Sequence, residues 1–184
     1  MASTPPKITL HMVSSLDGFI SKPDGDVSWM HSTDVFPAGK SLSEEEITDF
    51  LVGIDCYVMG AGTYDHALEL GWPYGDTPVI VLSHGARSSE RDSVSFFAGE
   101  PADLVSAQLQ GHENVWLVGG AQVAKAFLRA QLVDEIVVSM MPVLLGGGTL
   151  FFDYIGIEQR LHLKDVTAYN DGMVEMQYTL QKAD

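Results

Sequence analysis

Glycines at the ends of two apolar strands are the residues of this chain best suited to hold a ligand. Gly119 and Gly120 stand between a predicted strand and a predicted helix in LVGGAQVAKAF, and residues 60–63 repeat that arrangement in VMGAGTYDHAL. Glycine lets a backbone approach a ligand where a side chain would clash. The free N–H groups that begin the next helix attract anions. A pyrophosphate would suit both turns.

Each turn also has a simpler interpretation. The glycine pair is typical of a tight strand-to-helix turn, and Thr63 is typical of a helix N-cap. The chain has neither the G-x-G-x-x-G fingerprint nor a P-loop. Two such turns in one small sheet nevertheless favour a ligand more than either turn does alone.

Strands and helices alternate along most of the chain, and this order must position the two turns. We expect strands over 7–13, 55–60, 77–83, 93–99, 114–120 and 133–143, and helices over 41–55, 61–70, 100–110 and 121–131. Ser43 and Glu46 have the spacing of a capping box. Alternation of this kind predicts a mainly parallel sheet, with ligands at the carboxyl ends of its strands.

The end of the chain breaks this alternation. Residues 160–181 predict an antiparallel hairpin whose turn contains Asn170, Asp171 and Gly172. The hairpin should add antiparallel strands at one edge of the sheet. At 184 residues, we expect a single domain over residues 1–184.

Charge and composition exclude several classes of function. The net charge is −15, and the ten Lys and Arg residues are scattered, so we expect no nucleic-acid partner. Cys56 is the only cysteine, and His11 and His31 lack metal-ligand spacing, so we expect neither a disulfide nor a metal site. No signal peptide or membrane-length apolar run is visible. A cytoplasmic protein without a membrane partner is the expectation.

Five segments together resemble the dihydrofolate reductase-like superfamily. They are HMVSSLDGFIS, VMGAGTYDHAL, VIVLSH, VWLVGGAQVAKAFL and VDEIVVSMMPVLLGGGTLFF. The chain looks closest to stand-alone proteins similar to the reductase domain of the riboflavin-biosynthesis deaminase-reductase, over residues 7–181. The resemblance implies a three-layer α/β/α fold, usually a homodimer, that binds NADPH in an extended form.

The resemblance also implies which residues contact the cofactor. They lie at the ends of three predicted strands. The set is Gly60, Ala61, Gly62 and Thr63 at the phosphates, Leu82, Ser83 and His84 at the adenosine, and Val118, Gly119, Gly120, Ala121, Gln122 and Val123 at the pyrophosphate and nicotinamide. The family often joins the glycine pair by a cis peptide, so one is expected between residues 119 and 120.

Residues around the nicotinamide would form the substrate pocket. By resemblance they are Ser15, Leu16, Asp17, Met141, Leu145 and Gly146. Trp29, in the loop after the first strand, could wall an aromatic pocket or serve only in packing.

Two acids are candidates for delivering a proton. Asp17 lies in the SLDG segment, and Glu44 matches the position where dihydrofolate reductases carry an acid early in a helix. Simpler interpretations are a turn residue for Asp17 and a solvated first-turn glutamate for Glu44. An ordered water is a third source of the proton.

The chain departs from the family in its cations. Dihydrofolate reductases commonly place a basic residue against the cofactor 2′-phosphate, where this chain has Ala61; His84 and Arg87 are alternatives. A phosphorylated ribosyl-pyrimidine would need several cations. The expected function is an NADPH-dependent reductase that transfers hydride to a C=N or C=O group of a pterin- or pyrimidine-like heterocycle or a carbonyl compound. The alternative is a non-catalytic nucleotide-binding protein with the same fold.

Overall fold

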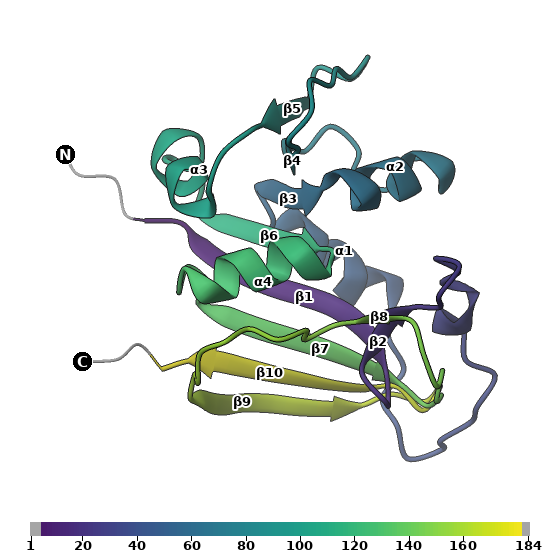
Figure 1. Ribbon diagram of the computed structural model, residues 1–184. Helices are drawn as coiled ribbons and strands as arrows, with labels where there is room; N and C mark the ends of the chain where they lie inside the picture. Colours follow the sequence, from purple (N-terminus) through teal and green to yellow (C-terminus); the bar gives the residue numbers. More distant parts are fainter. Residues whose placement is uncertain (1–4, 182–184) are drawn as a thin grey trace.

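The computed structural model describes residues 5–181, and its main feature is an eight-stranded sheet (Figure 1). The outer ends of the expected domain, residues 1–4 and 182–184, lie outside the described residues. The strand order is β5-β4-β3-β6-β1-β7-β10-β9. The strands are β1 (Lys7–Ser15), β3 (Cys56–Gly60), β4 (Val79–Leu82), β5 (Val94–Phe97), β6 (Asn114–Gly119), β7 (Glu135–Met141), β9 (Leu161–Ala168) and β10 (Val174–Leu180).

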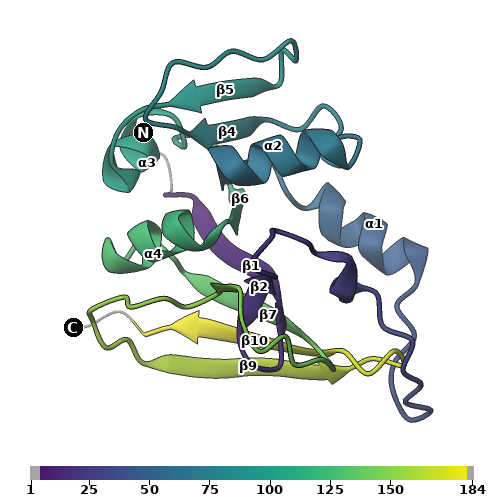
Figure 2. The ribbon, with the colours of Figure 1, turned by 45° about the vertical axis from the view of Figure 1, so that its right-hand side comes forward.

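Helices cover both faces of this sheet, which gives the three layers that the resemblance implies (Figures 1 and 2). The helices are α1 (Glu44–Val52), α2 (Ala61–Glu69), α3 (Pro101–Ala107) and α4 (Ala121–Arg129), with a short 3₁₀ helix η1 (Ser28–Met30). Side chains of α3 and α4 pack in one core, and side chains of α2 pack in the other. The Ser43–Glu46 capping box at the start of α1 is confirmed.

Strands β3 and β4 are buried on both faces, which explains their unbroken apolar sequences. On β3, Cys56 and Val58 pack in the core with Leu104 of α3 and Phe127 of α4. Tyr57 and Met59, which point to the opposite face, pack in the α2 core. Because β6, β3, β4 and β1 run parallel, their carboxyl ends meet at one edge of the sheet.

The C-terminal hairpin is antiparallel, as predicted. Strand β10 pairs with β7 and with β9, and Gly172 takes the left-handed φ of +82° in the turn between β9 and β10. A second, two-stranded sheet is a feature that the sequence did not predict. It joins β2 (Phe19–Ser21) to β8 (Thr149–Leu150), and both lie outside the strands expected from the sequence. Strands of two and three residues are too short to show an alternating pattern.

The helices of the described part of the chain are all too short or too polar to cross a membrane.

Candidate functional site

A large cleft opens where the carboxyl ends of the parallel strands meet the helices that follow them. Its volume is about 1090 Å³, just above the usual range of roughly 300–1000 Å³ for small-molecule sites. All of the residues expected to contact the cofactor line this cleft, except Gly119. The wall continues beyond them along β1, β6, β7 and β10. The cleft therefore has a glycine-rich half and a second half over the sheet.

Two helix N-termini stand side by side in the glycine-rich half. Helix α2 begins after Gly60 and α4 begins after Gly120, and neither N-cap residue supplies a side-chain hydrogen bond. A Cβ atom placed on Gly60 would lie 3.0 Å from Cγ2 of Val123, and one on Gly120 would lie 3.6 Å from Oγ1 of Thr63. Each glycine thus lets the other turn come close. The uncapped N–H groups of both helices favour an anion between them.

Gly119, which precedes the second of these turns, must also be glycine. Its φ is +103°, a conformation that favours glycine, and its added Cβ would collide with Cε and Sδ of Met12 at 2.9 Å. The peptide between Gly119 and Gly120 is cis, as expected. A dinucleotide fits this half of the cleft: its pyrophosphate would meet the amides of α2 and α4.

The end of the cleft at residues 82–84, where the adenosine is expected, offers few cations. Among the described residues, neither Lys nor Arg lines the cleft, although His84 and His66 do. Arg87 is engaged elsewhere: its Nη1 and Nη2 donate to the Asp65 carboxylate at 2.6 and 2.9 Å. A phosphate in this cleft would therefore be held chiefly by backbone N–H groups.

The Asp17 carboxylate ties two loops together. Its Oδ1 accepts hydrogen bonds from the Ser15 hydroxyl at 2.6 Å and the Leu145 N–H at 3.0 Å, and its Oδ2 accepts from the Gly146 N–H at 2.7 Å. The Ser15 hydrogen bond, with help from these amides, lowers the pKa of Asp17 to about 2. An acid of this strength is ionised near neutral pH and is a weak source of protons.

The structure places these four residues together, but outside the cleft wall formed by the described residues. The same is true of the other expected acid, Glu44, which is exposed in the first turn of α1. The remaining expected substrate residues also lie outside that wall. Trp29 and Met141 are buried, and Leu16 is 59% exposed.

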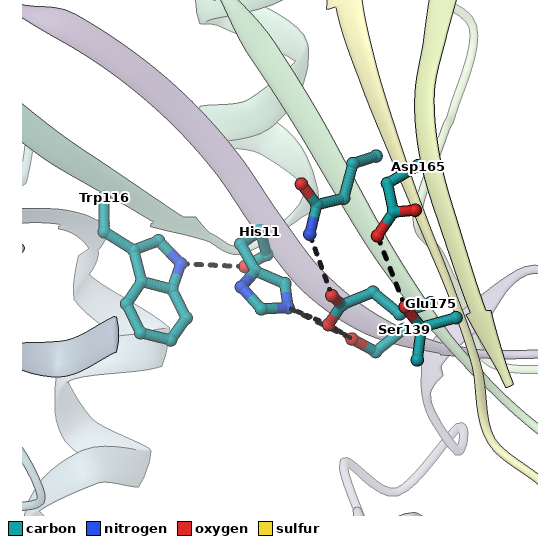
Figure 3. A network of polar contacts seen from close by, with 7 residues as sticks. His11, Trp116, Ser139, Asp165 and Glu175 are labelled. Atoms are coloured by element: carbon teal, nitrogen blue, oxygen red, sulfur yellow. Dashed lines mark hydrogen bonds and ion pairs between the residues drawn. The ribbon is translucent and has the colours of Figure 1, made fainter. Parts of the chain in front are cut away.

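Sequence reasoning missed the polar residues in the second half of the cleft. His11 of β1, Ser139 of β7 and Glu175 of β10 all line it, beside Trp116 of β6 (Figure 3). The available signal was alternation along β1, where Ile8 and Leu10 face the core and His11 must face the other way. Three polar residues from three neighbouring strands share this face.

A metal centre is not among the features of this site. Within residues 5–181, no group of three His, Cys, Asp or Glu side chains could hold a metal ion.

Comparisons with known proteins connect this geometry to a family. The model of the RibD C-terminal domain matches residues 6–175. YwjB, an uncharacterised protein of Bacillus subtilis strain 168, is 30% identical over 176 residues, which cover 94% of this chain and 97% of YwjB.

Two solved structures have the same fold. One, a protein of Shewanella sp. PV-4 that is named for riboflavin biosynthesis, has a TM-score of 0.81 at 24% identity, over 96% of this chain and 99% of its own. The other is dihydrofolate reductase from Enterococcus faecalis complexed with NADP(H), with a TM-score of 0.64 at 17% identity, over 98% and 99% of the two chains. Identities this low show the fold alone, which is dihydrofolate reductase-like as expected.

Proposed function

This chain belongs to the RibD C-terminal domain family, and from that premise we propose that it is an NADPH-dependent reductase of a small heterocyclic or carbonyl compound. The observation that carries the proposal is that the N-termini of α2 and α4 line the same cleft. Helix N-termini and nearby glycines suit a pyrophosphate. The second half of the cleft leaves room for a substrate beside the nicotinamide.

In this proposal the chain holds and orients the reactants. The N–H groups of residues 61–63 and 121–123 bind the cofactor phosphates, and residues 82–84 flank the adenosine. Gly119 and Gly120 permit close approach near the nicotinamide. The bound cofactor supplies the hydride, and the protein supplies position and exclusion of water.

The polarity of the cleft supports a substrate without phosphate groups. A phosphorylated ribosyl-pyrimidine would need cations, and neither Lys nor Arg lines the cleft among the described residues. Apolar side chains, among them Met30, Leu42 and Met173, line the cleft instead. A planar pterin- or pyrimidine-like ring, or a small carbonyl compound, suits this wall.

A non-catalytic nucleotide-binding protein is the second candidate. It is favoured by the positions of Asp17 and Glu44, since neither acid lines the cleft. The two candidates share cofactor binding and differ in turnover. Stopped-flow measurement of NADPH oxidation with dihydrofolate, pterins and simple carbonyl compounds separates them, because binding without oxidation by any acceptor supports the second.

We propose that the reductase works as a homodimer in the cytoplasm. Strand β9 is an edge strand that pairs only with β10 in the described sheet, and it exposes Leu161, Leu163 and Val166. An exposed apolar edge strand invites pairing with another chain. A second copy that covers this strand would bury those side chains.

The experiment for the proposed function is calorimetric titration with NADPH and NADH. We expect saturable binding of NADPH with one site per chain. Quenching of tryptophan fluorescence should accompany it, since Trp116 lines the cleft. Absence of binding at millimolar cofactor would remove the reductase proposal and the nucleotide-binding alternative together.

A further inference from the structure

A chain of polar side chains crosses the second half of the cleft from β1 to β10 (Figure 3). Nε2 of His11 lies 3.1 Å from Oγ of Ser139, and that hydroxyl lies 3.1 Å from Oε2 of Glu175. The direct distance from Nε2 to Oε2 is 3.7 Å. The other carboxylate oxygen of Glu175 accepts a hydrogen bond from the Gln177 side chain at 3.1 Å. The three strands thus place Ser139 between His11 and Glu175, within hydrogen-bond distance of both.

The hydrogen bonds among His11, Ser139 and Glu175 determine which atoms carry the protons. An ionised carboxylate can only accept hydrogen bonds, so Ser139 donates its single O–H to Glu175. The Ser139 oxygen is then free to accept, and Nε2 of His11 must be the donor. In the neutral imidazole, this leaves the lone pair on Nδ1. That atom is buried and has no hydrogen-bond partner in the structure.

The surroundings of His11 orient its ring and act on its charge in opposite directions. The Trp116 indole stacks on it at 5.0 Å, with 18° between the planes, and Phe50 of α1 meets it edge-on at 5.6 Å. Burial lowers the pKa of His11, and the negative charge of Glu175 opposes that effect. Strands β6 and β7 and helix α1 present Trp116, Ser139 and Phe50, so Glu175 is the charged group set against the ring.

We propose that His11 is a catalytic residue that exchanges a proton with the substrate through Nδ1, and that Ser139 and Glu175 are its positioning residues. The proposal rests on the proposed reductase function. Hydride from NADPH adds to the carbon of a C=N or C=O group, and the electron pair of the broken π bond moves to the nitrogen or oxygen. That atom takes the proton from Nδ1 of the charged imidazole. His11 returns to its neutral form and regains a proton from solvent.

Three features of the site support this role. His11 lines the same cleft as the two glycine turns, whereas Asp17 and Glu44 do not. Its Nδ1 is a buried polar atom of the cleft wall that lacks a partner, as is Nε2 of His66, but His66 lies in α2 and not among the strands of the second half. Glu175 can stabilise the positive charge that His11 carries before it gives up the proton. A substrate can reach the buried Nδ1 only if the imidazole ring or an aromatic neighbour moves. Phe50 is the neighbour that moves most easily, because it belongs to α1, a helix with no buried residue.

The first test is independent of any substrate. Long-range ¹H–¹⁵N spectra of the free protein, with the His11 resonances assigned by the His11→Gln variant, report which ring nitrogen carries the hydrogen. We expect the Nε2–H form, a titration midpoint below that of a free histidine, and a further fall of that midpoint in Glu175→Gln. An Nδ1–H form, or a midpoint unchanged in Glu175→Gln, would overturn the proposal.

The second test follows turnover with an acceptor that the wild-type protein reduces. His11→Gln should lower kcat by about 100-fold or more, and it should abolish the fall in kcat/KM as pH rises through the His11 midpoint. Its NADPH affinity should stay within about twofold of wild type, which shows that the cofactor half is intact. Ser139→Ala should lose part of the rate and Ser139→Thr should restore it. An unchanged pH profile in His11→Gln would refute the role.

The two proposals fail in different ways. If NADPH does not bind, or if the whole panel of acceptors leaves NADPH unoxidised, the reductase function fails, whatever the spectra of His11 show. If NADPH is oxidised and His11→Gln retains the wild-type rate, the function stands and the role of His11 is wrong.

Discussion

Replacing Gly62 by alanine should stabilise the protein while weakening its hold on the cofactor. Gly62 is the second residue of α2 and lines the cleft. A Cβ atom built there meets no protein atom within 4 Å. The added methyl group therefore projects into open space, in the glycine-rich half of the cleft. No protein atom needs to move to receive it.

Two opposite effects can be estimated for Gly62→Ala. Alanine in place of glycine in a helix raises the free energy of unfolding by about 0.4–1 kcal/mol, or roughly 1–4 °C in Tm for a domain of this size. A phosphate kept away from the amides of α2 loses one charge-assisted hydrogen bond, worth about 1.5–3 kcal/mol. The Kd for NADPH should then rise by roughly 10- to 150-fold.

Calorimetry and thermal unfolding measure both effects on the same sample. Gly147→Ala is the matched control, since its added Cβ also meets no atom within 4 Å and it lies outside the described cleft wall. The control should leave the Kd for NADPH unchanged. If Gly62→Ala raised Tm as expected but left the Kd within about twofold of wild type, the phosphates would not lie at α2.

Four further predictions test other parts of the account. Asp65→Asn should release Arg87 from its ion pair, and the freed guanidinium should then favour the 2′-phosphate of NADPH. The ratio of the Kd for NADH to the Kd for NADPH should rise by about threefold. The same ratio in the double variant Asp65→Asn with Arg87→Gln would contradict this role of Arg87. The Asp17 carboxylate, whose pKa is lowered to about 2, should stabilise the fold above its ordinary pKa and lose that effect as pH falls through 2. Asp17→Asn should therefore melt below wild type at pH 7 and converge with it near pH 2, whereas an equal Tm at pH 7 would exclude the loop-tying role. Leu163→Lys should halve the mass measured by light scattering if β9 forms the dimer interface, and a mass equal to wild type would place the interface elsewhere. The Cys56 thiol, whose pKa is raised to about 12 by burial, should react with a thiol reagent at pH 8 only after unfolding in denaturant; stoichiometric labelling of the native protein would refute its burial.

The main sheet was predictable because its strands and turns carry local signals. Apolar segments such as residues 56–59 are long enough to be recognised as buried strands. The capping box at Ser43 and the left-handed glycine at 172 mark their elements through local hydrogen bonding and backbone geometry. The positions of the residues expected at the cofactor also follow from the chain order, since each set succeeds a parallel strand.

The substrate half of the cleft was not predictable in the same way. Three residues that form its polar chain are 36 or more positions apart, and their meeting depends on strand order and register. Val13 pairs with Ser139, and Ser139 pairs with Glu175, so the side chains of these three residues lie on one face of the sheet. His11 shares that face because it is two residues from Val13 on the same strand. No local sequence pattern predicts that these side chains come into contact. The expected acids were identified from sequence motifs, and Asp17 shows why this is insufficient: its carboxylate is already occupied by the loop at 145–146.

A crystal structure of the protein grown with saturating NADPH tests the central claim most directly. We expect continuous density for one dinucleotide that runs from residues 82–84, across the N-termini of α2 and α4, to the glycine pair at 119–120, with the nicotinamide facing the half of the cleft that contains His11. A dinucleotide bound elsewhere, or a cleft that excludes it at saturating concentration, would contradict the account.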